Sequence, residues 1–362
     1  MKKVLGGFAV LIMAFGAWAG SSMDGIVARI AFVSDTHVNL RTNESGLSYN
    51  QHLDQAMAAI NAAKVDLVLI AGDLTDGGTQ EQMALFKRKV KQLKAPVMFV
   101  AGNHDVGMVG NDTVKTSITP DKVKRFSQEL GPNWFAHEKA GVRVVGINSC
   151  LFGTGFKEEE NQWRFLEQEL AKLHTKPTLL LEHFPLFIRT IDEPRISTWN
   201  MLPEPRKRLL ALIEQGGVST VLSGHLHYRI MNRLNGTLFL GNAPTAFGLP
   251  PGLQPEGWML LTVPREGEVQ FEFRVLESTV PGKAGSARGE IRKPKTEIRK
   301  KSEDRKPKSE SYADGNRGGR AEGGNPKTEI RNPKEIRRPR TEIRIQCGWQ
   351  SRAELGKMRN AE

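Results

Sequence analysis

Cysteine is nearly absent from this sequence of 362 residues, which contains only Cys150 and Cys347. Two cysteines cannot build the framework of several disulfides that stabilises many small exported domains. Cys150 lies within an apolar segment, so we expect it to be a small buried side chain rather than a nucleophile. The sequence therefore excludes a disulfide-stabilised scaffold.

A hydrophobic run long enough to span a membrane is also missing at the N-terminus. The apolar stretch at residues 4–19 follows Lys2 and Lys3 and is shorter than the ~20 residues of a spanning helix. It ends in Ala17-Trp18-Ala19, a pattern of small residues typical of a cleavage site. We expect residues 1–19 to be a signal peptide cleaved near Ala19, which makes the protein periplasmic or secreted; an uncleaved membrane anchor is the alternative.

The sequence has little net charge outside one segment. Residues 284–362 hold 22 of the 52 Lys and Arg residues and 12 of the 40 Asp and Glu residues, which gives this segment +10 of the total net charge of +12. The segment repeats PKTEIR and has no apolar period, so we expect a disordered tail. The tail is either a dispensable appendage or an electrostatic tether to anionic surfaces. We expect no specific nucleic-acid partner, because the remainder of the chain is nearly neutral.

Residues 26–280 alternate short apolar runs with helical segments, as in an α/β domain. Continuous runs of Val, Ile and Leu predict buried strands at residues 29–34, 66–71, 96–101, 142–148, 178–182 and 218–223. Helix start signals occur at Thr79, with Gln82 completing a capping box, and at Thr119-Pro120. Apolar spacing predicts further helices at residues 161–173 and 205–214.

After Ser223 the apolar runs are broken by Asn-Gly and Glu-Gly pairs. Such pairs are typical of hairpins, and we expect these strands to form a second, more antiparallel sheet. The predicted fold is therefore a four-layer α/β/β/α sandwich of two mixed sheets flanked by helices.

Polar side chains that bind metals or protons follow five of the predicted strands. They are Asp35 and His37; Asp73; Asn103, His104 and Asp105; His183; and His225 and His227. Ligands collect at the carboxyl ends of strands in α/β sheets, so we expect these groups to converge on one site. A single such match is common, but five in sequence order predict a metal centre.

The donor types limit the choice of metal. Imidazoles and carboxylates with one amide and no thiolate suit Fe, Mn, Zn or Co. Seven donors are too many for one tetrahedral ion, and they suit two ions about 4 Å apart that share a carboxylate. The sequence therefore predicts a dinuclear centre of the kind found in phosphatases and nucleases.

The motifs D-x-H, G-D, G-N-H-D, a lone His and G-H-x-H, in this order, resemble the calcineurin-like metallophosphoesterase superfamily. The resemblance covers roughly residues 28–276. It implies one metal held by Asp35, His37, Asp73 and His227, and a second held by Asp73, Asn103, His183 and His225.

The same resemblance implies that His104 acts as an acid near the substrate, oriented by Asp105. Hydroxide held between two metal ions is available at neutral pH and can attack phosphorus in line. The leaving oxygen then needs a proton, which an imidazole paired with a carboxylate can supply. Purple acid phosphatases of this superfamily carry a Tyr where this chain has Asp76, so no tyrosinate chromophore is expected.

The middle of the chain resembles the calcineurin-like phosphoesterase domain-containing branch, known for phosphatase activity. It also resembles class III cyclic nucleotide phosphodiesterases, which share GDLTD and GNHD. We expect a phosphatase that acts on small-molecule or peptide phosphate esters; a phosphodiesterase is the alternative, and a non-catalytic metal-binding scaffold is a further one.

The segment from Phe184 to Met201 connects two ligand-bearing strands and is expected to overhang the site. Arg189, Arg195 and Trp199 could bind a phosphate or stack on a leaving group. The alternative is a solvated loop with one packed aromatic side chain.

Overall fold

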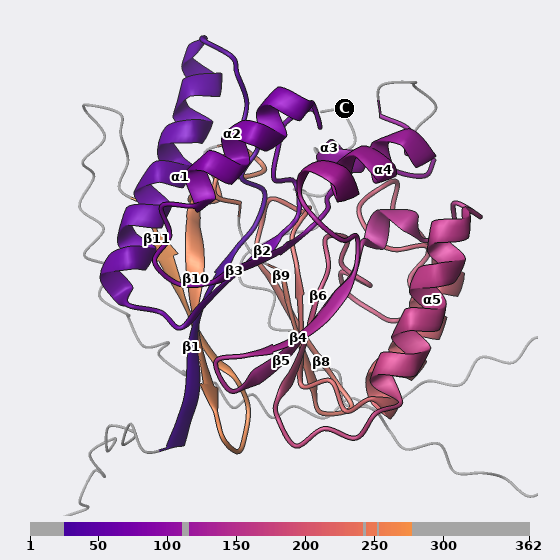
Figure 1. Ribbon diagram of the computed structural model, residues 1–362. Coiled ribbons are helices and arrows are strands. Elements are labelled where there is room, and N and C mark those ends of the chain that lie inside the picture. The colour runs from indigo at the N-terminus through magenta and orange to yellow at the C-terminus, as the bar shows by residue number, and fades with distance from the viewer. Residues whose placement is uncertain (1–24, 111–115, 242–243, 252, 277–362) are drawn as a thin grey trace, which may run out of the picture. The chain divides into compact units, whose positions relative to one another are not determined.

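The computed structural model describes residues 25–110, 116–241, 244–251 and 253–276 (Figure 1). The expected signal peptide and the expected basic tail both lie outside these residues. Among the described helices, none is long and apolar enough to cross a membrane.

The first sheet has the strand order β11-β10-β1-β2-β3. Strands β1, β2 and β3 are parallel, and they are extended by β10, which runs antiparallel to β1, and by β11, which runs antiparallel to β10. The parallel register aligns Val33 with Ile70 and Ala71 with Val100, so the three strands end at the same edge. The strand bounds are β1 (Ile26–Val33), β2 (Leu67–Ala71), β3 (Val97–Val100), β10 (Gly257–Pro264) and β11 (Gln270–Val275).

The second sheet has the strand order β4-β5-β6-β7-β9-β8. Strands β5, β6, β7 and β9 are parallel, and antiparallel strands close both edges. The bounds are β4 (Phe135–Lys139), β5 (Val142–Gly146), β6 (Thr178–Leu181), β7 (Thr220–Ser223), β8 (Ile230–Leu234) and β9 (Thr237–Gly241).

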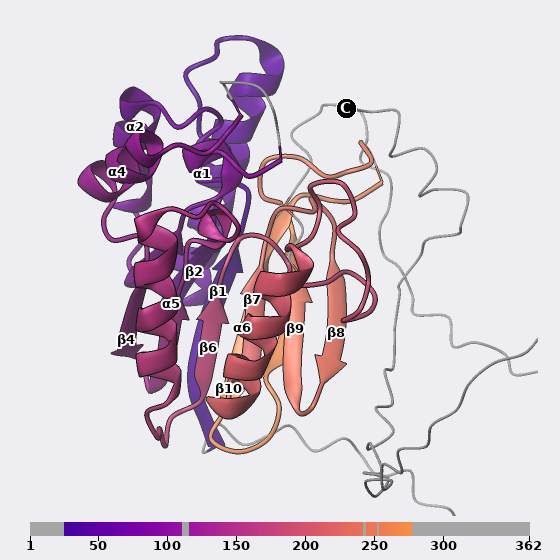
Figure 2. The ribbon, with the colours of Figure 1, turned by 90° about the vertical axis from the view of Figure 1, so that its right-hand side faces the viewer.

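Helices cover the outer faces of the two sheets, and Figures 1 and 2 show α1 and α2 on one side of the strands and α5 on the other. The apolar cluster between the sheets joins Phe32 and Leu69 of the first to Leu179 and Leu222 of the second. The expected α/β/β/α sandwich is thereby confirmed. The helices are α1 (Glu44–Ala63), α2 (Gln80–Val90), α3 (Asn103–Val106), α4 (Pro120–Glu129), α5 (Lys157–Leu170) and α6 (Pro203–Gln215).

The predicted helix starts are confirmed in most details. The side chains of Thr79 and Thr119 accept hydrogen bonds from the first turns of α2 and α4, and Pro120 stands at the start of α4. The side chain of Gln82 does not close a capping box, because its Oε1 accepts a hydrogen bond from the backbone N–H of Gly77 instead.

The prediction for the strands after Ser223 is wrong in one respect, since they do not form a separate sheet. The hairpin β8–β9 joins the second sheet, where Leu240 pairs with Leu222, and the hairpin β10–β11 joins the first sheet, where Met259 pairs with Phe32. Both hairpins cover an edge that β1 or β7 would otherwise expose. Strand β4 and helix α1 were also not predicted, although four apolar residues spaced on one face signal α1: Leu53, Ala56, Met57 and Ile60.

Candidate metal centre

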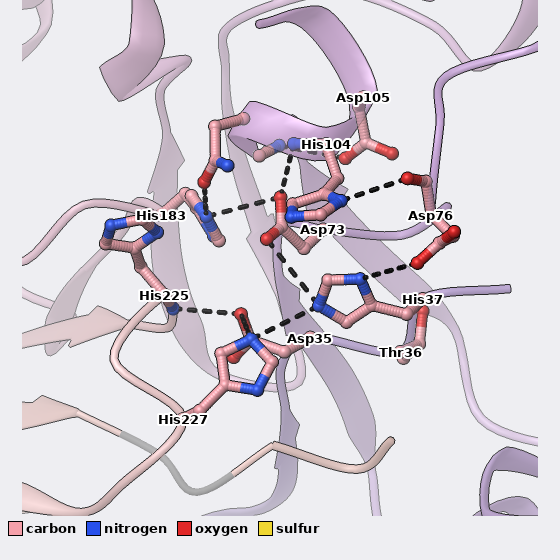
Figure 3. Close-up of polar contacts among 12 residues, drawn as sticks. Asp35, Thr36, His37, Asp73, Asp76, His104, Asp105, His183, His225 and His227 are labelled. Carbon is pink, nitrogen blue, oxygen red and sulfur yellow. Dashed lines mark hydrogen bonds and ion pairs between the residues drawn. The ribbon is translucent and has the colours of Figure 1, made fainter. Parts of the chain in front are cut away.

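The side chains that follow five strand ends of the two sheets meet at one place, and Figure 3 shows the polar contacts among them. In the first sheet, β1 ends shortly before the predicted ligands at residues 35–37, and β2 ends shortly before Asp73. Strand β3 ends shortly before α3, which begins at the predicted ligand Asn103. Strands β6 and β7 of the second sheet end before His183 and before the pair His225 and His227. The sandwich thus brings together side chains that are up to 192 positions apart, from Asp35 to His227.

The first cluster contains Asp35, His37, Asp73 and His227, with one ligand atom of each within 4.8 Å of the others. The Nε2 atoms of His37 and His227 are 3.2 Å apart. All four side chains are at most 6% exposed. This is the set that the sequence resemblance assigns to one metal.

The second cluster contains Asp73, His183 and His225 within the same 4.8 Å limit. Asn103 belongs beside them, because its Oδ1 is 2.9 Å from Nε2 of His183. Asp73 is common to both clusters: its Oδ2 is 3.7 Å from Nε2 of His37 and its Oδ1 is 3.3 Å from Nε2 of His183. Its carboxylate is therefore placed to bridge two ions.

Backbone carbonyl groups fix the tautomers of three of these histidines. A carbonyl oxygen can only accept, so the ring nitrogen beside it carries the hydrogen. Nδ1 of His183 donates to Ala71, Nε2 of His225 donates to Thr198, and Nδ1 of His227 donates to Phe247, at 2.8 to 2.9 Å. When a ring is neutral, its opposite nitrogen therefore presents a lone pair, which is the state that a metal ligand needs.

The donor atoms fit a cation better than they fit one another. Oδ1 of Asn103 and Oδ1 of Asp73 lie 2.9 and 3.3 Å from Nε2 of His183, so three possible donor atoms face one point. Oδ2 of Asp35 is buried and has no hydrogen-bond partner among the described residues. An unpaired buried carboxylate oxygen costs about 1–3 kcal/mol or more, and a bound metal ion removes that cost. The residues present therefore suit a two-metal centre.

The charges of the clusters support this fit. Burial raises the pKa of Asp73, but the neighbouring His183, His104 and His37 outweigh burial and hold its pKa well below the usual value. Burial and the charge of His183 lower the pKa of His225. Burial likewise lowers the pKa of His227 to about 4. These shifts favour an ionised carboxylate at Asp73 and neutral rings at His225 and His227. Burial lowers the pKa of His183, but the charge and hydrogen bond of Asp73 raise it to about 9.

The backbone of the centre is strained. Five of the predicted ligands have a left-handed conformation, which costs of order 1 kcal/mol or more at a residue other than glycine. Backbone hydrogen bonds from Asp35 to Gly72 and from His37 to Asp73, at 3.1 and 2.9 Å, hold two of these loops together. The five residues and their φ angles are Asp35 (52°), His37 (43°), Asp73 (48°), His225 (71°) and His227 (55°).

Removal of metal should therefore lower the stability of the folded protein. Ions present at 100 to 1,000 times their Kd stabilise a fold by about 3–4 kcal/mol, which corresponds to roughly 5–15 °C in Tm for a domain of this size. We expect chelation to lower the Tm in differential scanning calorimetry by this amount and re-addition of metal to restore it. An unchanged Tm in a sample whose metal loss is verified would contradict the prediction.

His104 lies at the solvent-exposed side of the centre, at the start of α3. Its Nδ1 donates to the backbone carbonyl of Asp76 at 3.0 Å, and its ring centroid is 4.5 Å from that of His37. Although removal from water lowers the pKa of His104, the charge of Asp73 and the hydrogen bond to Asp76 raise it above the usual value. Nε2 is thus the ring atom free to give a proton to a substrate.

Asp105 does not orient His104, which corrects the expectation from sequence. Its carboxylate is buried and accepts hydrogen bonds from the backbone N–H groups of Gly102, Leu74 and Thr75 and from the hydroxyl of Thr75, at 2.7 to 3.0 Å. Adjacent residues of a helix do not face each other, so His104 and Asp105 point in different directions. Asp105 instead joins the loop of Asp73 to the loop of Asn103.

The contact between these two loops also requires glycine at position 102. A Cβ atom there would lie 2.1 Å from the backbone nitrogen of Asp73 and 2.2 Å from its Oδ1. No side chain fits at such distances. The close approach lets the backbone N–H of His104 donate to Oδ1 of Asp73 at 2.8 Å.

Replacement of Asp105 by alanine should destabilise the protein strongly. The change leaves the N–H groups of Gly102, Leu74 and Thr75 without their acceptor, and each unsatisfied buried group costs about 1–3 kcal/mol. We expect urea unfolding to show a loss of about 3–5 kcal/mol. Asp105→Asn, which keeps one accepting oxygen, should lose less; equal and small losses for both variants would rule out the joining role.

Asp76 belongs to the site, although its sequence motif did not predict this. Its Oδ1 lies 3.7 Å from Nδ1 of His37 and 3.1 Å from Nη2 of Arg41, and its carbonyl holds His104. The position of Asp76 three residues after Asp73 is the only signal in the sequence. The backbone N–H of Asp76 donates to the carbonyl of Val38, which places it beside the loop of His37.

The overhanging segment before α6 is organised by a buried glutamate. The carboxylate of Glu193 accepts hydrogen bonds from the backbone N–H groups of Ile188, Arg189 and Thr190 and from the amide of Asn200, at 2.6 to 3.1 Å. This arrangement holds the carbonyl of Thr198 against His225.

The three substrate candidates of this segment differ in their placement. The ring of Trp199 is 5.7 Å from that of His225, so it flanks the centre. Nη2 of Arg195 donates to the carbonyl of Val109 at 2.6 Å, and the guanidinium is thereby engaged with another loop. Arg189 is exposed, and its backbone N–H donates a hydrogen bond to the carboxylate of Glu193.

Comparisons with known proteins agree with this geometry. The sequence model of the calcineurin-like phosphoesterase family matches residues 28–229. The chain is 31% identical over 214 residues to the probable glycerophosphodiester phosphodiesterase GpdQ of Arcobacter nitrofigilis, covering 54% of this chain and 70% of that protein. It is 26% identical over 246 residues to the serine/threonine-protein phosphatase CPPED1 of Homo sapiens, covering 63% and 74% of the two chains.

A solved structure has a similar fold. The purple acid phosphatase PPD1 from yellow lupin (Lupinus luteus) superposes with a TM-score of 0.51 and 16% sequence identity, over 68% of this chain and 51% of that chain. At this level of identity the likeness concerns the fold alone.

Proposed function

The chain belongs to the calcineurin-like phosphoesterase family, whose members are dinuclear-metal hydrolases of phosphate esters, and from this premise we propose that it prefers phosphomonoesters. The observation that carries the proposal is the exposure of His104, the expected acid, beside the buried ligands. Among the seven predicted ligands, His104 and Asp105, only His104 is exposed.

Aromatic rings pack against histidines of both clusters. Phe247 lies 4.1 Å from the ring of His227 and 5.1 Å from that of His37. Phe184 lies 4.3 Å from the ring of His225, with Trp199 beside it. A monoester has one alcohol group, which can leave past His104, whereas a diester needs room for a second one. This arrangement supports a monoester substrate.

The residues of the chain have separable tasks in the reaction. When bound, the two ions supply Lewis-acid activation of water and of the phosphoryl oxygens. The carboxylate of Asp73, which belongs to both clusters, would hold both ions. The carbonyl of Asp76 keeps one hydrogen of His104 on Nδ1. The proton on Nε2 of the imidazolium is therefore the one that His104 transfers. It moves to the leaving alcohol oxygen as the bond between phosphorus and that oxygen breaks.

The preference can be measured with matched aryl esters. We expect kcat/KM of the metal-loaded enzyme for p-nitrophenyl phosphate to exceed that for bis(p-nitrophenyl) phosphate by at least about tenfold, a transition-state difference of about 1.4 kcal/mol. A preference for the diester would replace the proposal by the alternative of a phosphodiesterase, which the likeness to GpdQ favours.

A further inference from the structure

Arg41 stands beside the exposed side of the centre and has no role in the chemistry described above. Its Nη2 is 3.1 Å from Oδ1 of Asp76, the residue whose carbonyl holds His104. The side chain of Arg41 is 43% exposed. A guanidinium carries five N–H donors, so one contact with Asp76 does not exhaust its donors.

The loop that carries Arg41 is held in place by two asparagines. The backbone N–H of Arg41 donates to Oδ1 of Asn39 at 3.0 Å, and Nδ2 of Asn39 donates to the carbonyl of His37 at the same distance. Nδ2 of Asn50, on α1, donates to the carbonyl of Asn39 at 2.9 Å. These hydrogen bonds therefore fix the backbone of Arg41 relative to the loop of His37.

Two aromatic rings extend from Arg41 to the metal ligands. The guanidinium carbon lies 5.4 Å from the ring centroid of Tyr49, and the ring of Tyr49 stacks on Phe247 at 5.0 Å. Phe247 in turn packs against His227. Arg41 is thus a cation on an aromatic surface, and both Arg41 and the proposed acid His104 contact Asp76.

We infer that Arg41 is a specificity-determining residue that binds an anionic group, a carboxylate or a second phosphate, on the alcohol portion of the substrate. The inference rests on the proposed function, because it takes the side of His104 as the exit of the alcohol. Guanidinium pairs with carboxylate and phosphate oxygens through parallel hydrogen bonds, and the fixed loop reduces the entropy lost on binding. The substrate class is therefore a phosphate ester of an acidic or phosphorylated alcohol.

Binding of non-hydrolysable phosphonates to the metal-loaded protein tests this inference without turnover. Butylphosphonate is the reference ligand, 4-phosphonobutyrate adds a carboxylate, and butane-1,4-bisphosphonate adds a second phosphonate. By isothermal titration calorimetry we expect at least one of the two anionic ligands to bind about fivefold more tightly than the reference, near the upper range for an exposed ion pair.

Arg41→Met keeps most of the side-chain volume and should abolish this advantage while leaving the affinity for butylphosphonate within about twofold. Arg41→Lys should keep part of the advantage, because it retains the charge without the planar fork. Arg164→Met removes an exposed arginine of α5, which is paired with Glu160, and should change nothing.

The outcomes separate the two proposals. No advantage of either anionic ligand in the wild type, or an equal loss for all three ligands in Arg41→Met, would overturn the inference and leave the proposed function standing. Failure of butylphosphonate itself to bind the metal-loaded wild type would contradict the proposed function.

Discussion

Replacing Asp73 by asparagine should reduce kcat/KM for phosphate esters by at least about 100-fold. Loss of a group that merely supports a metal ligand already costs about 10–100-fold in metal affinity, and Asp73 contacts both clusters. Asparagine has nearly the same shape but only one oxygen and no charge, so it cannot bridge two cations. The same substitution should lower the metal content below two ions per chain, as measured by inductively coupled plasma mass spectrometry.

A matched control for this variant is Asp54→Asn, which removes an exposed carboxylate that pairs with Lys89 on the surface. It should retain two ions and full activity. Full activity and two bound ions in Asp73→Asn would show that the carboxylate does not bridge.

Substituting glutamine for His104 should lower kcat by about 10²–10⁴-fold, the usual contribution of a general acid. The metal content should stay near that of the wild type, because the ring of His104 is exposed and the proposed ligands are formed by other residues. The loss should be larger for alkyl phosphates than for p-nitrophenyl phosphate, since an alkoxide needs the proton more than a stabilised phenolate does.

His137→Gln is the control for this substitution, because His137 is exposed on the edge strand β4 and stacks on Phe135 away from the clusters. It should leave kcat unchanged. A His104→Gln enzyme with a uniform loss for all leaving groups, or with its metal lost, would assign His104 to another role than that of the acid.

The proposed ligand set could be predicted from sequence because each group follows a buried strand. A run such as residues 66–71 is readable from its apolar composition alone, and the carboxyl ends of parallel strands meet at one edge. The order of the motifs then matched a known superfamily. Asp35, Asp73 and His183 therefore lie where the sequence places them, together in space.

The role of Asp105 could not be predicted in the same way, because neighbours in sequence need not be neighbours in space. Its hydrogen-bond partners Leu74 and Thr75 are about 30 positions away and come close only through the pairing of β2 with β3. The placement of Arg41 beside Asp76 likewise depends on contacts between two loops.

The pairing of the hairpins β8–β9 and β10–β11 also could not be predicted from neighbouring residues. The Asn-Gly pair at 235–236 correctly indicates the turn between β8 and β9. Nothing local indicates that β9 pairs with β7 while β10 pairs with β1, because the choice of sheet depends on which edge remains open. Local sequence thus predicted the strands themselves better than it predicted which strands pair in the sheets.

The dinuclear centre itself is tested most directly by anomalous diffraction from crystals of the metal-loaded protein, recorded at the absorption edge of the bound metal. Two anomalous peaks about 3.5–4 Å apart, one on each side of the carboxylate of Asp73, are the expected result. A single peak, or two peaks that do not share Asp73, would contradict the account.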